Sequence, residues 1–342
     1  MITTYFSASS FNTYDECEIK YMFNYVLGRR EETVNKKTNL GTIQHRVFET
    51  VAKIKQAADL GQISIQDDIL GEVKVDGFII EDYIPKIFLH YRTLFDYNDW
   101  SDSDVDTLYR WTNIVKESNL WPAKHKIVSP EMKFQFPIKK DWAAFDFTID
   151  GKKVEGYLGL KGVVDLVIEL DSSFYEIVDW KTGQRKNWST GEIKTAEYLQ
   201  TDPQLMFYYY AARQIFPSID TLMTSIYYLD HGGVFTPQFD DEILPVVEGM
   251  LKKKFDHIRK NKKPAQICTK NRWQCSKFCF FGKNTFEGTG VKPLTEFRNG
   301  QVCKKGETMT MCEQMRFEID RKGLDRAVAE YKSPDFKIKV VE

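Results

Sequence analysis

The sequence predicts an α/β fold in which helices flank a mixed central sheet. Residues 163–170 (VVDLVIEL) and 174–179 (FYEIVD) are rich in β-branched and apolar residues, and a good turn sequence at 171–173 separates them. Downstream, a helical segment at 203–215 leads into a further apolar strand at 222–229, so helices and strands alternate along the chain. The predicted strands are residues 130–137, 143–150, 153–170, 174–181 and 222–229.

Helical periodicity and capping residues predict the helices. The helix at 203–215 begins with an N-cap aspartate, Asp202, and has Pro203 in its first turn. The helix at 41–58 is opened by Gly41-Thr42. The full set of predicted helices is residues 9–27, 41–58, 203–215, 241–260 and 307–331.

The hairpin carries charges at positions where a buried strand should have none. With a loop at 171–173, antiparallel pairing places Asp165 opposite Asp179. Like charges roughly 5 Å apart destabilise a sheet unless something offsets them, and a divalent cation would do so. Lys181 lies two residues beyond Asp179 and shares its face, while Trp180 points to the other side. One face therefore gathers two carboxylates and an ammonium group.

Phosphodiester hydrolysis needs this combination. A metal holds the phosphate and acidifies a water, carboxylates hold the metal, and a cation orients the nucleophile or stabilises the transition state. A site of hard oxygen ligands suits Mg²⁺ or Mn²⁺. The alternative is a partly buried Asp–Lys salt bridge in an ordinary hairpin, since isolated D-x-K triplets are common.

The hairpin, its surroundings and the two ends of the chain resemble the RecB-like branch of the PD-(D/E)XK nuclease superfamily. This branch includes CRISPR-associated RecB-like nucleases and the nuclease domains of RecB and AddB. The family elements occur in the family's order over most of residues 5–282. Asp165 and Asp179-Trp180-Lys181 match the catalytic core, although Val164 stands where the superfamily name has proline. The resemblance implies a restriction-endonuclease-like core with a helical insertion and a metal-cluster clamp.

The resemblance also implies roles for residues outside the hairpin. Gly41-Thr42-Ile43-Gln44-His45 is similar to the helix that contributes a metal-binding histidine, and Glu131 begins an alternating strand where the family often has an acidic residue. A lone helical histidine is more often packed or solvated, but only His45 sits in such a motif. Glu49 is either a partner of His45 or a surface charge. The implied catalytic residues are Asp165, Asp179, Lys181 and Glu131. The implied metal ligands are His45, Asp165, Asp179 and the backbone carbonyl of Trp180.

Gln204 and Tyr208 are four residues apart and share one helix face. They match the Gln-x-x-x-Tyr element by which RecB-like nucleases are told from other superfamily members, and which there touches DNA beside the active site. The alternative is an amphipathic helix in which the tyrosines simply pack. The implied DNA-binding residues are Gln204, Tyr208, Arg185 and Lys186. Trp188 is available for base stacking. The overall net charge of −1 is unhelpful to DNA binding, but the positive charges of Arg185 and Lys186 are locally favourable.

The cysteines form a second group. Cys17, Cys268, Cys275 and Cys279 resemble the one N-terminal and three C-terminal ligands of a [4Fe–4S] cluster that clamps the ends of the nuclease domain. The spacing here is C-x6-C-x3-C, whereas the family spacing is C-x2-C-x5-C, so zinc and free or otherwise paired thiols stay open as alternatives. Disulfides are least expected, because no signal sequence is evident. Cys303 and Cys312 have no family counterpart.

These expectations combine into a metal-dependent DNA nuclease, with single-stranded DNA exonuclease activity favoured by the resemblance. The alternative is a non-catalytic nuclease-fold protein that binds DNA or a partner in recombination or CRISPR adaptation. Recombination or replication proteins are expected as further partners. No run of roughly 18 apolar residues predicts a membrane span, so we expect a cytoplasmic protein, or host-cytoplasmic if viral. The predicted segments are 1–61 (N-terminal helical part of the nuclease domain), 62–128 (helical insertion), 129–282 (nuclease core and cysteine cluster) and 283–342 (C-terminal extension).

Overall fold

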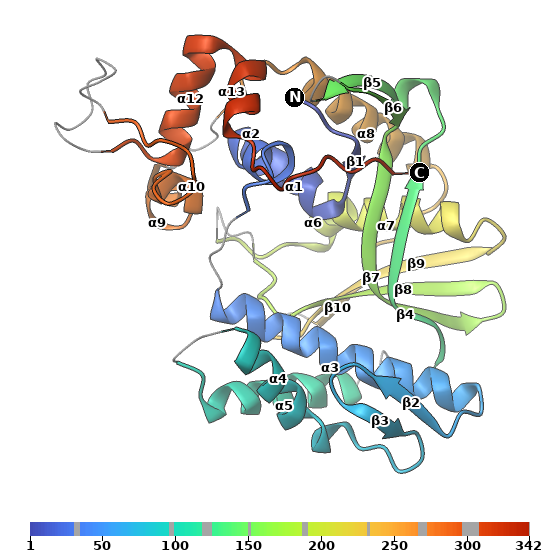
Figure 1. The fold of residues 1–342 in the computed structure, drawn as a ribbon. Helices are drawn as coiled ribbons and strands as arrows, with labels where there is room; N and C mark the ends of the chain where they lie inside the picture. Colours follow the sequence, from blue (N-terminus) through green and yellow to red (C-terminus); the bar gives the residue numbers. More distant parts are fainter. Residues whose placement is uncertain are drawn as a thin grey trace. The chain divides into compact units, whose positions relative to one another are not determined.

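The chain divides into two compact units, which are described separately. In this computed structural model (Figure 1), the described residues are 1–30, 35–95, 99–117, 125–149, 152–186, 191–230, 233–265, 272–295 and 308–341. Unit 1 comprises residues 1–33, 135–161 and 248–342, and unit 2 comprises residues 34–134 and 162–247.

The main sheet is mixed. Its strands are β1 (Tyr5–Phe6), β4 (Lys126–Pro137), β7 (Gly159–Asp171), β8 (Phe174–Lys181), β9 (Thr221–Tyr228) and β10 (Gly233–Phe235). The order is β1-β7-β8-β9-β10, with β4 also paired with β7. The pairs β1/β7 and β8/β9 are parallel, whereas β7/β8 and β9/β10 are antiparallel. This mixed sheet confirms the α/β fold predicted from the sequence.

The β7–β8 hairpin has the predicted register but a different loop. Leu166 pairs with Val178, as the predicted register requires. The pairing shifts between Glu169 and Asp171, so the connection is a two-residue turn at 172–173 and not the predicted three-residue loop. A β-bulge adds one residue to one strand. Here the extra residue compensates for the turn being one residue shorter than predicted, so the register beyond the bulge is the predicted one.

Helices and a small hairpin complete unit 2. Their bounds are α3 (Lys36–Asp59), β2 (Ser64–Asp67), β3 (Gly71–Lys74), a 3₁₀ turn η2 (Ile80–Asp82), α4 (Ile84–Leu94), α5 (Asp102–Lys116), α6 (Ala196–Gln200) and α7 (Pro203–Ile215). The α3 helix begins five residues before the predicted start, because the Asn35 side chain caps it by accepting from the Lys37 N–H. Residues 62–128, predicted to be more helical than extended, contain the β2–β3 hairpin as well as α4 and α5.

Both faces of the unit 2 sheet are covered by helices. On one face, Val178 and Trp180 pack in the core that α3, α4 and α5 share, and the rings of Phe48 and Trp180 lie 4.9 Å apart. On the other face, Leu205 of α7 packs with Ile226 of β9. Figure 1 shows α3 and α7 on opposite sides of β8 and β9. The alternation predicted for β8 is therefore observed.

Unit 1 is mainly helical and is assembled from three stretches of chain. Its elements are α1 (Ala8–Glu16), α2 (Glu18–Tyr21), a π-helix η1 (Met22–Val26), a 3₁₀ turn η4 (Asp141–Ala143), β5 (Ala144–Ile149), β6 (Lys152–Tyr157), most of α8 (Ile243–Lys260), α9 (Arg272–Lys277), α10 (Phe280–Lys283), α12 (Met311–Lys322) and α13 (Leu324–Tyr331).

Three predicted elements that lie wholly or partly in unit 1 are each divided in the structure. The helix predicted at 9–27 breaks at Cys17, whose backbone is extended. The strand predicted at 153–170 is interrupted at Leu158, which separates β6 from β7. The helix predicted at 307–331 is divided at Gly323, where φ is +83° and the right-handed helix cannot continue.

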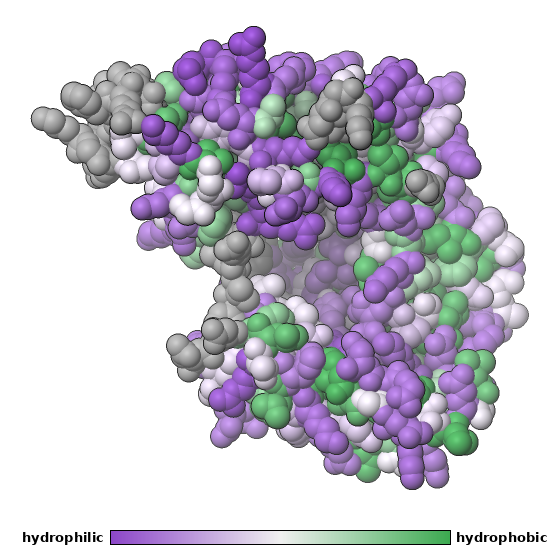
Figure 2. Space-filling model, viewed as in Figure 1, coloured by the Kyte–Doolittle hydropathy of each residue, from purple (hydrophilic) through white to green (hydrophobic). Residues whose placement is uncertain are grey.

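The surface seen in Figure 2 is mostly hydrophilic, with hydrophobic residues in small separate groups. Among the described residues, no helix has the length and apolar content needed to cross a membrane.

Candidate active site

The β7 and β8 strands position two aspartates at the point where their regular pairing ends. Asp165 and Asp179 come one residue beyond the pair Leu166–Val178. The Asp165 Oδ2 atom accepts a hydrogen bond from the backbone N–H of Trp180 at 2.7 Å. This bond replaces the backbone ladder and holds the Asp165 carboxylate beside the end of β8.

The α3 helix brings His45 to the same place. The Nδ1 atom of His45 lies 3.1 Å from Oδ1 of Asp165. One turn earlier, a Cβ atom on Gly41 would lie 2.7 Å from Oγ1 of Thr182, which follows β8. The absence of a side chain at Gly41 therefore permits the close approach of α3 that places His45 against Asp165.

A buried ion-pair network supports this part of α3. Arg46, the neighbour of His45, is buried and pairs with the buried Asp67 at 2.5 Å and with Asp68 at 2.6 Å. Glu49 pairs with Arg46 at 3.0 Å and with Lys53 at 2.5 Å. The carboxylate of Glu49 thus has its own cationic partners on α3.

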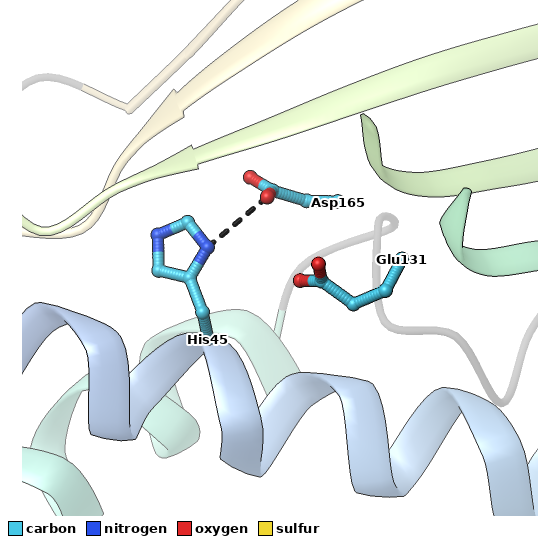
Figure 3. Close-up of side chains that lie close together, drawn as sticks. All are labelled: His45, Glu131 and Asp165. Carbon is cyan, nitrogen blue, oxygen red and sulfur yellow. Dashed lines mark hydrogen bonds and ion pairs between the residues drawn. The ribbon is translucent and has the colours of Figure 1, made fainter. Parts of the chain in front are cut away.

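Glu131 reaches the site through an unusual backbone conformation. Its φ is +44°, in the left-handed region, although it lies within β4. Such conformations cost of order 1–3 kcal/mol and are concentrated at functional sites. Figure 3 shows the Glu131 carboxylate pointing toward His45 and Asp165, and one ligand atom from each of the three residues lies within 4.8 Å of the others.

Asp179 is buried between two polar side chains. Its Oδ2 atom lies 2.7 Å from Nζ of Lys181, and its Oδ1 atom accepts a hydrogen bond from Nε2 of Gln204 at 3.0 Å. The same Gln204 amide donates to the hydroxyl of Tyr208 at 3.2 Å. The α7 helix thus presents Gln204 and Tyr208 together beside Asp179, on the shared face predicted from their spacing.

Burial and mutual repulsion shift the pKa values of these groups. Burial, with the charge of Asp165 adding to it, raises the pKa of Glu131 to about 7. Burial raises the pKa of Asp179 to about 6 even though the Lys181 ammonium opposes the shift. For His45, burial lowers the pKa, but the Asp165 carboxylate outweighs it and the net pKa is raised. A bound cation would favour the ionised forms of Glu131 and Asp179 and so oppose these shifts.

Sequence comparison identifies the family. The family model described as the PD-(D/E)XK nuclease superfamily matches residues 5–279. The chain belongs to the PD-(D/E)XK nuclease superfamily. The sequence prediction is confirmed at this level, and the superfamily assignment supports a nuclease fold.

Solved structures similar to this PD-(D/E)XK chain are distant in sequence. A proposed exonuclease from Eubacterium rectale is 14% identical, covers 78% of this chain and 85% of its own, and has a TM-score of 0.42. The protein SSO0001 is 13% identical, with coverage of 69% and 94% and a TM-score of 0.24. No curated protein matches the sequence significantly.

PD-(D/E)XK nucleases generally use divalent metals, and the donor atoms of this chain fit such an ion. His45, Glu131 and Asp165 offer one imidazole nitrogen and two carboxylate oxygens within a small space. Among the described residues, Asp179 lies outside this group of three. Its buried Oδ2 atom is ion-paired with Lys181 at 2.7 Å.

The other residues predicted for the PD-(D/E)XK site lie at or after the end of β8. Trp180 uses its N–H to hold Asp165. The guanidinium of Arg185 lies over the ring of Phe235, 4.1 Å from its centre, and the backbone of Lys186 bridges to Ile193. Trp188 lies outside the described residues.

Three of the four cysteines predicted as cluster ligands are described, and all three lie in unit 1. Cys17 separates α1 from α2, Cys275 lies in α9, and Cys279 is the N-cap of α10. Cys268 and Cys303 are outside the described residues. Cys312, for which the sequence offered no role, is the second residue of α12 and is buried.

Sequence reasoning missed two features in and around the candidate active site. The left-handed backbone of Glu131 had no signal, because it follows Pro130 in an otherwise regular alternating strand. The pairing of Arg46 with Asp67 joins residues 21 positions apart in sequence, and nothing in either segment indicates the contact.

Proposed function

We propose that this chain is a Mg²⁺- or Mn²⁺-dependent deoxyribonuclease of the RecB-like branch, acting as an exonuclease on single-stranded DNA. The observation that carries the proposal is the hydrogen bond from Gln204 to the buried carboxylate of Asp179. It links the Gln-x-x-x-Tyr helix to the D-x-K strand, the combination that distinguishes this branch in the sequence.

The residues proposed to hold the metal are His45, Asp165, Asp179 and the backbone carbonyl of Trp180, with Glu131 beside them. When bound, the ion would polarise a phosphate oxygen and acidify a water. Its positive charge would also allow Glu131 and Asp179, whose pKa values are raised to about 7 and about 6, to ionise near neutral pH.

Lys181 has a separate role in this proposal. Burial lowers the pKa of the Lys181 side chain, but the Asp179 carboxylate outweighs this effect and the net pKa is raised. The Lys181 side chain is therefore an ammonium at neutral pH. Its Nζ atom is held 2.7 Å from Asp179. There it can orient a water for attack and offset the charge that develops on the phosphate. We assign Gln204 to orienting Asp179, and Tyr208, Arg185 and Lys186 to contacts with DNA.

An iron–sulfur cluster bound by cysteines of unit 1 is also proposed. Cys17, Cys275 and Cys279 are its described candidates, and thiolates are the ligands that such clusters take. Zinc is the alternative metal for the same thiols. Recombination or replication proteins are proposed as partners.

The test is an assay with end-labelled and circular DNA, each single- and double-stranded, in Mg²⁺, Mn²⁺ or EDTA. We expect stepwise release from the ends of linear single strands, dependence on the metal, and little cleavage of circles. A purified Lys181→Met variant controls for contaminating nuclease. DNA binding without cleavage under any metal would instead support the non-catalytic alternative.

A further inference from the structure

Four cysteines from three segments of unit 1 are brought to one region. Among the described residues they are outside disulfides, and Cys17 and Cys312 are buried. The four are Cys17, Cys275, Cys279 and Cys312. Cys312 follows Cys279 by 33 positions in the sequence, so no short motif connects them.

Contacts of α10 join Cys275 and Cys279 on one side. Cys279 is the N-cap of α10, and Gly282 lies within that short helix. A Cβ atom on Gly282 would be 2.5 Å from the backbone oxygen of Cys275 and 3.1 Å from its Cβ. The lack of a side chain at Gly282 therefore allows α9 to pack directly on α10, with both cysteines adjacent.

The end of α10 also fixes the start of α12. Asn284, the C-cap residue of α10, accepts a hydrogen bond from the backbone N–H of Met311 at 2.7 Å. Cys312 is the next residue along the chain. Since α10 has only four residues, this bond keeps Cys312 close to the segment that carries Cys279.

An aromatic stack connects the Cys17 segment to α10. The ring of Phe23, in the π-helix that follows α2, stacks on the ring of Phe281 with centroids 4.3 Å apart and planes inclined by 7°. Both rings are fully buried. Phe281 is two residues beyond Cys279, so α2 and α10 are held against one another within unit 1.

Electrostatic interactions agree with this convergence. The thiol of Cys312 interacts with Cys17, Cys279 and Cys275. Cys279 also interacts with Cys17. Arg316 acts on Cys312 and Lys20 acts on Cys279, so positive charge is available beside these sulfur atoms.

We infer that Cys312 is a ligand of the cluster, completing a four-thiolate set with Cys17, Cys275 and Cys279. The inference rests on the metal centre of the proposed function and replaces one of the four residues that the sequence pattern indicated. It makes α12 part of the clamp, so the centre ties together three segments of unit 1.

The test uses the full-length chain purified without oxygen. We compare wild type, Cys312→Ser, and a Cys268→Ser/Cys303→Ser double variant as the matched control, measuring iron, sulfide and the broad absorbance near roughly 400 nm. The double variant should retain the wild-type iron content, and Cys312→Ser should lose most of it, at least about fivefold. Loss of iron from the double variant, or full retention in Cys312→Ser, would overturn the inference.

If Cys312→Ser fails to fold, the iron content of the double variant tests the inference. The cysteines that remain in the double variant are the four of the proposed set. A colourless wild type with one equivalent of zinc would remove the iron–sulfur assignment alone, and the same variants would then be scored by zinc. A wild type with neither metal overturns both ideas. DNA cleavage is measured separately, so failure of the nuclease proposal is distinguishable.

Discussion

One amide nitrogen connects β8 to the neighbouring α7 helix: Nε2 of Gln204 donates to Oδ1 of Asp179 at 3.0 Å. The same nitrogen reaches the hydroxyl of Tyr208 at 3.2 Å. Because Asp179 is buried, the orientation of its carboxylate depends on these few partners.

Replacing Gln204 should impair catalysis more than stability. We expect Gln204→Met to lower the rate of DNA cleavage by roughly 10- to 100-fold, since a misplacement of about 1 Å can have that effect. Gln200→Met is the matched control, because Gln200 is exposed on α6 and donates to the backbone of Gln238. Equal rates for the two variants would show that the Gln204 hydrogen bond does not position Asp179.

Asp179 and Lys181 should separate metal binding from chemistry. We expect Lys181→Met to lose at least about 100-fold in cleavage rate, as transition-state charge stabilisation is lost, while Mn²⁺ affinity stays nearly unchanged. Asp179→Asn should lose both cleavage activity and Mn²⁺ affinity. Calorimetric titration with Mn²⁺ checks the binding, and Lys126→Met, which removes a surface ion pair with Glu169, is the control. Strong Mn²⁺ binding by Asp179→Asn would contradict the ligand assignment.

Metal binding should depend on pH through Glu131. Its pKa is raised from 4.5 to about 7, so the metal-free native state holds a proton there that the unfolded chain releases. Without metal, stability therefore falls as pH rises from about 4.5 to 7, and Mn²⁺ affinity should rise over that range because binding displaces the proton. Thermal unfolding in EDTA measures how stability changes with pH, and Mn²⁺ titrations measure how affinity changes with pH. Both pH dependences should be weaker in Glu131→Gln than in the wild type. Identical slopes in wild type and variant would count against this role.

The ion pair of Arg46 should contribute strongly to stability. Arg46→Met leaves the buried carboxylate of Asp67 without its cation, which typically costs about 3–5 kcal/mol. Urea unfolding measures the loss, and adding Asp67→Asn should recover part of it. Arg110→Met, which breaks an exposed pair with Asp230 at 2.7 Å, should cost no more than about 1 kcal/mol.

The sequence predicted best the features that depend on local pattern. The register that brings Asp165 near Asp179, and the helix that begins at Pro203, follow from strand alternation and capping. The features it missed depend on tertiary contacts or on backbone strain. The left-handed conformation of Glu131 has no local signal in the sequence. The position of Cys312 near Cys279 depends on contacts between α10 and α12, which are distant in sequence.

The discontinuity of unit 1 bears on the order in which the protein can fold during synthesis. Unit 2 is complete in sequence at Val247, whereas Cys312 leaves the ribosome 65 residues later. At about 5–20 residues per second, several seconds separate the two events. The nascent chain can therefore form its carboxylate site before Cys312 has been synthesised. Loading of an inorganic centre on the cysteines would then be a late maturation step, and folding of the carboxylate site would not depend on it.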